Sequence, residues 1–454
     1  MAELRPLRGI RYTPSAGPLG TLTSPPYDVI DEEQRARLAA KNTRNMVHLI
    51  LPQGEEDRYR LAAEKLESWQ REGFLAQERD PALYLYRQTF SAPDGRTLVR
   101  TGFLGLLRIE PEGGAVRHHE RTLAKPLEDR LRLIRATRTQ LSPVFVLYSD
   151  PSGGALRGLE ACSTKERPAT RAVANAAYGR RANELKPGAV QEFNDEDGVR
   201  HWLQPISDEQ AIAEARKTLD PLPVVIADGH HRYSAAMEFR DRLHKAFPED
   251  DPELPENFIL ACFVRAEDPG LFVQPTHRIV LAGKEKGPKP TALLGALSNR
   301  FEVQSLNIPA AAHAEGTVAP LRSDAGSRVV IGVRFAGDPR FHVLLLKEGD
   351  APFKKHALEA PMRGLDVAVL HKLILEPEYG IAEDASRRGA RLVYERDAAR
   401  AATFGSNGEA QAVFFLRPIP TPTILEITAH GLKLPQKSTY FAPKLASGLV
   451  LRRM

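Results

Sequence analysis

Residues 224–233 constrain the fold of this 454-residue chain more strongly than any other segment. An apolar run, Val-Val-Ile-Ala, is typical of a buried strand. Ala236, Phe239, Leu243 and Phe247 then recur at the spacing of one helix face. The polar turn Asp-Gly-His-His-Arg between them is therefore expected where a strand leads into the N-terminus of a helix.

The N-terminus of this predicted helix suits an anion. Its first backbone N–H groups have no partners within the helix, and the helix dipole favours negative charge there. Gly229 permits a tight turn and close approach of a ligand, and Arg232 offers a planar guanidinium suited to phosphate or carboxylate. Asp228 is suited to capping the helix or to holding a cation or hydroxyl. A plain capped strand–helix turn is an equally weighted interpretation of this segment.

Composition and charge narrow the class of protein. The 63 Lys and Arg residues exceed the 58 Asp and Glu residues too slightly to predict nucleic-acid binding, although an anionic small substrate is compatible. Cys162 and Cys262 have no metal-like spacing, which disfavours a disulfide framework. No apolar run approaches the roughly 18 residues of a membrane span, and the first residues lack a signal-peptide core. We therefore expect a cytoplasmic protein with no membrane partner.

A second polar cluster lies near the start of the chain. Pro25 and Pro26 hold the backbone extended, so Tyr27 and Asp28 are expected on a rigid edge. Rigid presentation of these two side chains at a pocket is the functional interpretation. A cap or turn role for Asp28 is the alternative.

A third polar cluster occupies residues 116–122. Glu120 is a candidate general base, and Arg117, His119 and Arg121 are placed to steer an anion toward it. A short charged edge strand would have the same composition and is an equally weighted alternative.

Residues 284–290, Lys-Glu-Lys-Gly-Pro-Lys-Pro, form the best linker candidate because they are charged and interrupted by proline and glycine. They predict an N-terminal domain at residues 1–284 and a smaller α/β C-terminal domain at residues 291–454. Within the latter, residues 365–375 are expected to form a helix and residues 424–428 a strand.

Two further clusters combine basic and hydroxyl side chains. One precedes the linker and comprises Thr276, His277 and Arg278. The other lies near residue 440, where an oxyanion or phosphate could be held by Lys437, Ser438, Thr439 and Lys444. A basic loop near solvent is the slightly favoured alternative for this last cluster.

These clusters occur together in an order that resembles the DUF1015 family of bacterial and archaeal proteins. The segments that carry the resemblance are Pro-Pro-Tyr-Asp-Val-Ile (25–30), His-Glu-x-Thr (119–122), Asp-Gly-His-His-Arg-Tyr (228–233), Thr-His-Arg (276–278) and Lys-Ser-Thr-Tyr-Phe-Ala-Pro-Lys (437–444). The resemblance runs from about residue 8 to about residue 450. It implies an α+β (mixed α/β) chain whose N-terminal domain has the ParB/sulfiredoxin-like fold.

The resemblance also implies a function. The members of this wider group with a known activity are free serine kinases, which phosphorylate the hydroxyl of L-serine with ADP or ATP. The Gly-x-x-Arg-type box that binds nucleotide phosphates in that fold matches Gly229, His230, His231 and Arg232. Asp228, directly before the box, is expected to contribute to the same site. The implied cofactors are therefore ATP or ADP, with Mg²⁺, and the implied acceptor is serine or a similar metabolite.

The catalytic acid of those kinases is a glutamate near the N-terminus, within a motif that has no certain counterpart here. Asp28 matches its position and Glu120 matches its residue type, so both are candidates for the base. The expected substrate-binding residues are Tyr27, His119, Thr122, Thr276, His277, Arg278, Lys437, Ser438, Thr439 and Lys444. We expect the clusters before the linker to converge on one pocket, with Asp228 within about 15 Å of at least one of Asp28 and Glu120.

Two other functions compete with the kinase. A metal-dependent phosphohydrolase would draw ligands from His118, His119, Glu120 and the Asp228–His231 segment, but adjacent histidines on a helix diverge by about 100°, so each pair would supply one ligand. A nucleotide-gated regulatory protein would need the phosphate box without a catalytic acid. No Gly-x-x-x-x-Gly-Lys-Ser/Thr segment is present, so the chain is not a P-loop kinase.

Overall fold

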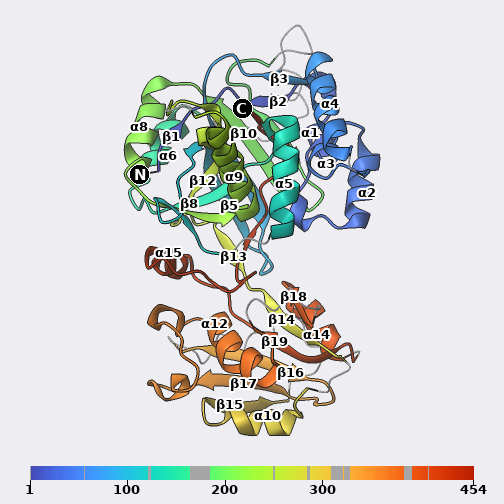
Figure 1. The fold of residues 1–454 in the computed structure, drawn as a ribbon, viewed down its shortest axis with the longest axis vertical. Helices are drawn as coiled ribbons and strands as arrows, with labels where there is room; N and C mark the ends of the chain where they lie inside the picture. Colours follow the sequence, from blue (N-terminus) through green and yellow to red (C-terminus); the bar gives the residue numbers. More distant parts are fainter. Residues whose placement is uncertain are drawn as a thin grey trace. The chain divides into compact units, whose positions relative to one another are not determined.

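The computed structural model describes residues 2–55, 57–120, 124–163, 185–248, 251–283, 287–307, 321, 328–382, 391–406 and 408–454. The chain forms two compact units (Figure 1). Unit 1 comprises Met1–His118, Thr122–Phe272 and Pro443–Met454, and unit 2 comprises His119–Arg121 and Val273–Ala442. The predicted mixed α/β class is confirmed.

The boundaries of the units differ from the predicted segments, residues 1–284 and 291–454. Strand β14 (His277–Leu281) pairs with β18 (Leu392–Glu395) and β19 (Ala410–Phe415), so it belongs to the sheet of unit 2. Strand β21 (Arg452–Arg453) pairs with β7 (Thr139–Gln140) in unit 1. Composition predicted a domain boundary near residue 285. The pairing of strands, however, determines which unit a segment belongs to.

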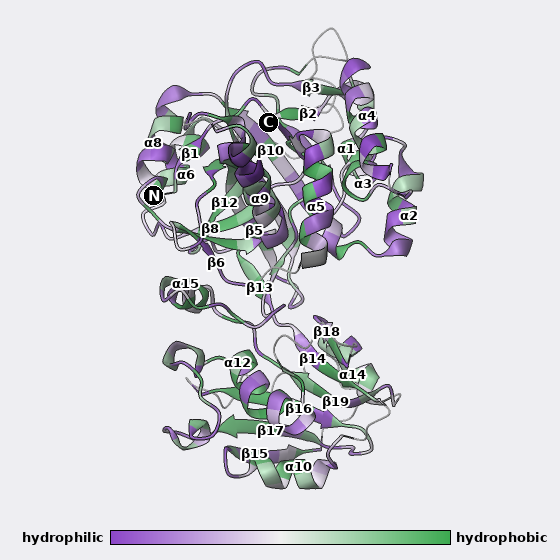
Figure 2. Cartoon of the chain, in the orientation of Figure 1, coloured by the Kyte–Doolittle hydropathy of each residue, from purple (hydrophilic) through white to green (hydrophobic). Residues whose placement is uncertain are grey.

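Unit 1 is built on a nine-stranded mixed sheet with the order β6-β11-β8-β12-β5-β4-β10-β9, and β1 also pairs with β5. Strand β11 is parallel to β6 and antiparallel to β8, and β8 is parallel to β12. The core strands β5, β8 and β12 are largely hydrophobic (Figure 2). The strands are β1 (Leu4–Arg5), β4 (Leu83–Ser91), β5 (Thr97–Arg108), β6 (Val116–His118), β8 (Val144–Tyr148), β9 (Gln191–Asn194), β10 (Arg200–Ile206), β11 (Val224–Asp228) and β12 (Phe258–Arg265).

Helices cover this sheet. A second hydrophobic core also forms in unit 1. Helices α5 and α9 pack side by side, and α6 packs on α8 (Figure 1). The second core forms around Tyr12, Leu66 and Trp69, near the short strands β2 (Ile10–Tyr12) and β3 (Leu75–Gln77). The helices are α1 (Leu19–Leu22), α2 (Glu32–Lys41), α3 (Val47–Ile50), α4 (Arg58–Arg71), α5 (Ala124–Thr137), α6 (Gly154–Ala161), α8 (Glu209–Leu219) and α9 (His230–Ala246), with the 3-10 turn η2 at Tyr27–Val29.

Unit 2 has a six-stranded sheet with the order β15-β17-β16-β19-β14-β18. Strands β16 (Val330–Phe335) and β17 (Phe341–Leu346) form an antiparallel pair. Strand β15 is Phe301–Leu306, and β13 (Phe272–Gln274) pairs with β20 (Tyr440–Ala442). The helices are α10 (Pro290–Leu297), α12 (Asp366–Leu370), α13 (Glu376–Tyr379), α14 (Ala398–Ser406) and α15 (Thr421–Ala429).

One prediction for unit 2 needs correction. Residues 424–428, predicted as a strand, lie within α15, where Pro420 is the N-cap and Ile424, Ile427 and Thr428 are buried at helical spacing. The predicted helix at residues 365–375 is α12 followed by a π-helical turn at His371–Leu375. Among the described residues, no helix combines the length and apolar character needed to cross a membrane.

Candidate functional site

The predicted strand–turn–helix is confirmed at β11, Gly229 and α9. Gly229 is the N-cap of α9 and adopts the left-handed conformation, with φ 89° and ψ 27°, which glycine reaches without steric cost. The helix starts without a side-chain cap. Its first turn therefore presents the partial positive charge of a helix N-terminus to the surroundings of Asp228.

The carboxylate of Asp228 is shared by two cations. Nη2 of Arg232 donates to Oδ2 at 2.7 Å, and Nζ of Lys444 donates to Oδ1. The three side chains are only 10–11% exposed. Together they carry a net charge of +1 at the N-terminus of α9, which favours an anionic ligand over a cationic one. We refer to Asp228, Gly229, Arg232 and Lys444 as the turn site.

Arg232 also fixes the geometry of the turn. Its Nη1 donates to the carbonyl of Pro143, immediately before β8. The guanidinium lies over Gly229, because a Cβ atom added there would be 2.9 Å from Cζ, Nε and Nη2 of Arg232. Arg232 therefore positions Asp228, a role that the sequence did not suggest.

The segment that carries Lys444 is held by buried polar side chains. Nε2 of Gln88 on β4 donates to the carbonyl of Lys444 at 2.9 Å. Arg100 on β5 donates to the carbonyl of Pro443 and to Oε1 of Gln88, and its guanidinium lies 4.9 Å from the centre of the Phe145 ring. Sequence reasoning missed both residues, although a buried arginine within an apolar strand was a visible signal.

Tyr27 and Asp28 lie on η2 in the same unit. The guanidinium of Arg130 stacks on the Tyr27 ring at 4.0 Å, and burial raises the pKa of Tyr27 to about 12, with Asp28 adding to the shift. Burial lowers the pKa of His231, while the negative charges of Asp28 and Asp228 oppose that shift. Asp28 and Asp228 thus both act electrostatically on His231, which associates the Tyr27–Asp28 cluster with the turn site.

A small cavity lies beside these residues. It is lined by Tyr27, Arg130, Arg232, Gln140 and Ser142 among others, and its volume is about 60 Å³. That volume suits one or two water molecules, whereas ligand pockets occupy roughly 300–1,000 Å³. A nucleotide at the turn site would therefore lie outside this cavity or require it to widen.

Two histidines of unit 1, His118 and His230, pack against each other. The rings of His118 and His230 are 5.9 Å apart, and His118 contacts the edge of Tyr233 at 5.1 Å. His230 is buried. Within the described part of the chain, no group of three or more His, Cys, Asp and Glu side chains is arranged to hold a metal ion.

A second cluster of predicted residues lies in unit 2, around the turn at Lys437. The carboxylate of Glu120 accepts a hydrogen bond from the backbone N–H of Lys437. Lys437 has a φ of 52°, which is uncommon for a residue with a side chain. The buried guanidinium of Arg278 donates to the carbonyls of Thr276 (2.7 Å), Lys437 (3.1 Å) and Gln436 (3.0 Å). This strained turn is thus held from two sides.

Tyr394 completes this cluster and was missed by sequence reasoning. Its ring lies 4.7 Å from the guanidinium of Arg278 and 5.3 Å from Nζ of Lys437. Burial lowers the pKa of Arg278 to about 10 and raises the pKa of Tyr394. Glu120 acts electrostatically on both Arg278 and Tyr394.

The other predicted residues of unit 2 are engaged within the protein. Nε2 of His119 lies 2.8 Å from Oγ1 of Thr439, and Oγ of Ser438 donates to the carbonyl of Pro435. His277 is buried, its Nδ1 accepts from the N–H of Leu416 at 3.2 Å, and burial lowers its pKa to about 4. The predicted roles of these residues in substrate binding stay predictions.

The structure thus divides the predicted site residues between the two units. Unit 1 contains Tyr27, Asp28, Asp228, Gly229, His230, His231, Arg232 and Lys444, whereas unit 2 contains Glu120, His119, Thr276, His277, Arg278, Lys437, Ser438 and Thr439. Thr122 lies outside the described residues. The approach of Asp228 to Glu120, which belong to different units, stays a prediction.

Comparison with known proteins identifies a family. The model of the family described as "Protein of unknown function (DUF1015)" matches residues 4–368, most of the chain, and ends before the Lys437 turn. A search of curated proteins found no match.

Several solved structures also match. A mutant free serine kinase in complex with AMP is 13% identical, with 74% of this chain and 86% of that chain covered and a TM-score of 0.34. Another mutant of free serine kinase, in complex with ADP, is 11% identical, with 75% and 87% covered and a TM-score of 0.34. A conserved hypothetical protein from Pyrococcus furiosus is 12% identical, with 75% and 91% covered and a TM-score of 0.32.

Proposed function

This chain belongs to the family described as protein of unknown function (DUF1015), and we propose that it is a nucleotide-dependent small-molecule kinase. As such a transferase it would move a phosphoryl group from ATP or ADP to the hydroxyl of free L-serine or a similar metabolite. The acceptor is proposed because the motifs of this chain resemble a family to which the free serine kinases are related.

One observation carries the proposal: Asp228 holds Arg232 and Lys444 at the uncapped N-terminus of α9. Phosphoryl transfer is catalysed mainly by positioning and by offsetting the negative charge of the phosphates. Two cations fixed by a buried carboxylate are already oriented before a ligand arrives. Together with the helix dipole, they supply the positive surroundings that nucleotide phosphates require.

The base that receives the proton of the acceptor hydroxyl is proposed to be Asp28 or Glu120. Asp28 is exposed and belongs to the same unit as the turn site. Glu120 is already engaged by the backbone of Lys437 in unit 2. These contacts support Asp28 as the first variant to test, with Glu120 as the alternative.

Mg²⁺ is also part of the proposal. It is commonly held by substrate phosphates and one or two carboxylates, without a protein cage. Asp28 is an exposed carboxylate in the same unit as the turn site, which is consistent with that arrangement. When bound, the metal would offset phosphate charge.

The proposal is tested with a panel of nucleotides and hydroxyl-bearing amino acids, with products identified by mass spectrometry. Equal amounts of phosphorylated amino acid and of nucleotide product support a kinase. Release of inorganic phosphate alone would instead identify a phosphohydrolase, and binding without turnover would identify a regulatory protein.

A further inference from the structure

Unit 1 contains a second cavity, open to solvent, with a volume of about 330 Å³. It shares no lining residue with the small cavity beside Arg232. Its lining includes four arginines and one acidic residue, which are Arg5, Arg8, Arg452, Arg453 and Glu253. We call it the arginine cleft. Four guanidinium groups against one carboxylate leave an excess of three positive charges.

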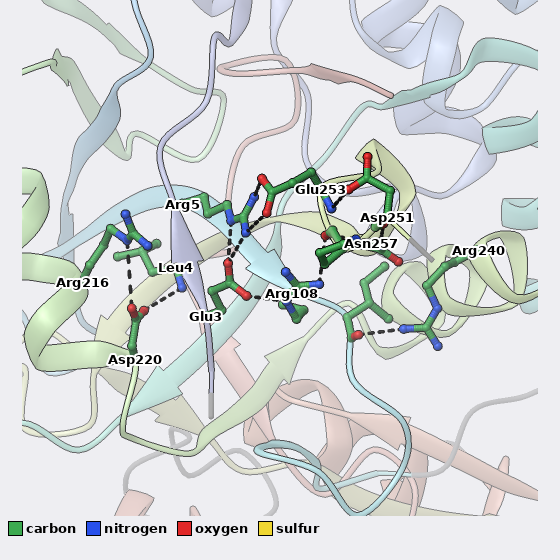
Figure 3. Close-up of polar contacts among 12 residues, drawn as sticks. Glu3, Leu4, Arg5, Arg108, Arg216, Asp220, Arg240, Asp251, Glu253 and Asn257 are labelled. Atoms are coloured by element: carbon green, nitrogen blue, oxygen red, sulfur yellow. Dashed lines mark hydrogen bonds and ion pairs between the residues drawn. The ribbon is translucent and has the colours of Figure 1, made fainter. Parts of the chain in front are cut away.

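The charge of Arg5 is balanced within the protein. Arg5 donates to both carboxylate oxygens of Glu253 and also to Glu3, which accepts from Arg108 as well (Figure 3). The guanidinium groups of Arg5 and Arg108 lie 4.3 Å and 4.6 Å from the centre of the Phe258 ring. Two arginines and two glutamates therefore neutralise one another at this edge of the cleft.

The other three arginines have no such partner. Nε of Arg8 donates to the carbonyl of Glu78 at 3.2 Å, and Nη1 of Arg452 donates to the carbonyl of Phe258 at 2.8 Å. These acceptors are uncharged. Among the described residues, Arg8, Arg452 and Arg453 form no ion pair, and both Arg8 and Arg453 are exposed to solvent.

Of Arg8, Arg452 and Arg453, Arg452 carries the charge that water solvates least. It is buried, and burial lowers its pKa to about 10, with Glu256 opposing the shift only in part. A buried cation that contacts carbonyls alone gains from a nearby anion. Arg8 and Arg453 lie where they can contact the same anion from the solvent side.

We propose that the arginine cleft binds a small polyanion that carries phosphate or several carboxylate groups. The planar guanidinium matches the geometry of both groups and forms paired hydrogen bonds with them. The volume of the cleft is within the range of small-molecule sites. This site is separate from the turn site in its residues and does not depend on the proposed kinase activity.

The test uses inorganic pyrophosphate as the probe and isothermal titration calorimetry on the whole chain. The cleft variant combines Arg8→Gln with Arg453→Gln, both exposed, so that folding is preserved. The control combines Arg60→Gln with Arg132→Gln, which are exposed on α4 and α5 and lower the net charge equally. We expect the cleft variant to bind pyrophosphate about tenfold or more weakly, the scale of a lost charged hydrogen bond, and the control to bind as the wild type does.

A third variant, Lys444→Met, distinguishes binding at the cleft from binding at the turn site. Pyrophosphate should still bind at the arginine cleft of this variant. Equal affinities for the cleft variant and its control would overturn the proposal, as would a wild type that gives no binding outside the turn site. Binding of an oligonucleotide or an acidic peptide at the cleft without any binding of pyrophosphate would also overturn it.

Discussion

The ammonium group of Lys444 donates a hydrogen bond to Asp228, a residue 216 positions earlier in the chain. The bond joins the end of β11 to the segment that leads into the final strand of unit 1. Arg232 occupies the other oxygen of the same carboxylate. The proposed phosphate site is therefore assembled from two distant segments, and neither segment contains it alone.

Replacement of Lys444 by methionine should weaken both folding and nucleotide binding. The substitution leaves Asp228 buried with one cation instead of two, and we expect a loss of about 1–3 kcal/mol in the free energy of unfolding. Nucleotide affinity should fall about tenfold or more in calorimetry. Lys217→Met on the exposed face of α8 is the control, and equal behaviour of the two variants would contradict the role given to Lys444.

Gly229→Ala should be costly for two separate reasons. Alanine at φ 89° is strained by about 1–2 kcal/mol, and its Cβ would be 2.9 Å from the guanidinium of Arg232. Gly95→Ala has a similar φ of 82° with nothing within 4 Å, so it carries only the backbone cost. Urea unfolding should show the larger loss for Gly229→Ala, and only this variant should weaken nucleotide binding.

Amide variants should identify the base. Asp28→Asn or Glu120→Gln should lower kcat by about 10²-fold or more while leaving nucleotide affinity unchanged, since an amide cannot accept the hydroxyl proton. Turnover is followed by mass spectrometry and affinity by calorimetry. If neither variant slows turnover, the proposed acid–base step is wrong.

Unit 2 should lose stability in mild acid. Burial lowers the pKa of His277 to about 4 and that of His371 to about 3. Because these values lie below the ordinary value of 6.5, the unfolded state binds protons first. Stability is therefore complete above pH 6.5 and decreases as the pH falls toward 4, by up to about 3 kcal/mol for His277.

The pH dependence can be measured by hydrogen exchange in β16, β17 and β19. Tryptophan fluorescence is unsuitable because Trp69 and Trp202 both belong to unit 1. His371→Gln keeps an acceptor for Nε of Arg278, which lies 3.4 Å from Nε2 of His371, and it should reduce the pH dependence. The exposed His430→Gln is the control, and an unchanged slope in His371→Gln would count against burial as the cause.

Local patterns in the sequence were sufficient to predict several helices and strands. The strand, turn and helix at residues 224–246 were predicted because an apolar run, a glycine and a helical repeat follow one another directly. The strand predicted at residues 424–428 was wrong. The segment Ile-Leu-Glu-Ile-Thr favours a strand when it is considered without its neighbours. The preceding prolines start a helix there, and packing of Ile424 and Ile427 stabilises it.

Other features depend on contacts between distant residues and were not predictable from one sequence. Arg100 and Gln88 hold the segment of Lys444 through its backbone carbonyls, which carry no side-chain signature. Tyr394 joins the Lys437 turn only because β18 pairs with β14. The assignment of residues 443–454 to unit 1 likewise follows from strand pairing and not from composition.

The return of residues 443–454 to unit 1 has a consequence for biosynthesis. A ribosome must translate all of Val273–Ala442 after most of unit 1 has emerged and before Lys444 exists. At about 5–20 residues per second, the nascent unit 1 spends on the order of ten seconds or more without its final strand. During that interval the nascent chain contains Arg232 but not Lys444. Asp228 can therefore pair with only one of these two cations. The nascent chain therefore cannot form the turn site until Val273–Ala442 and Lys444 have been translated.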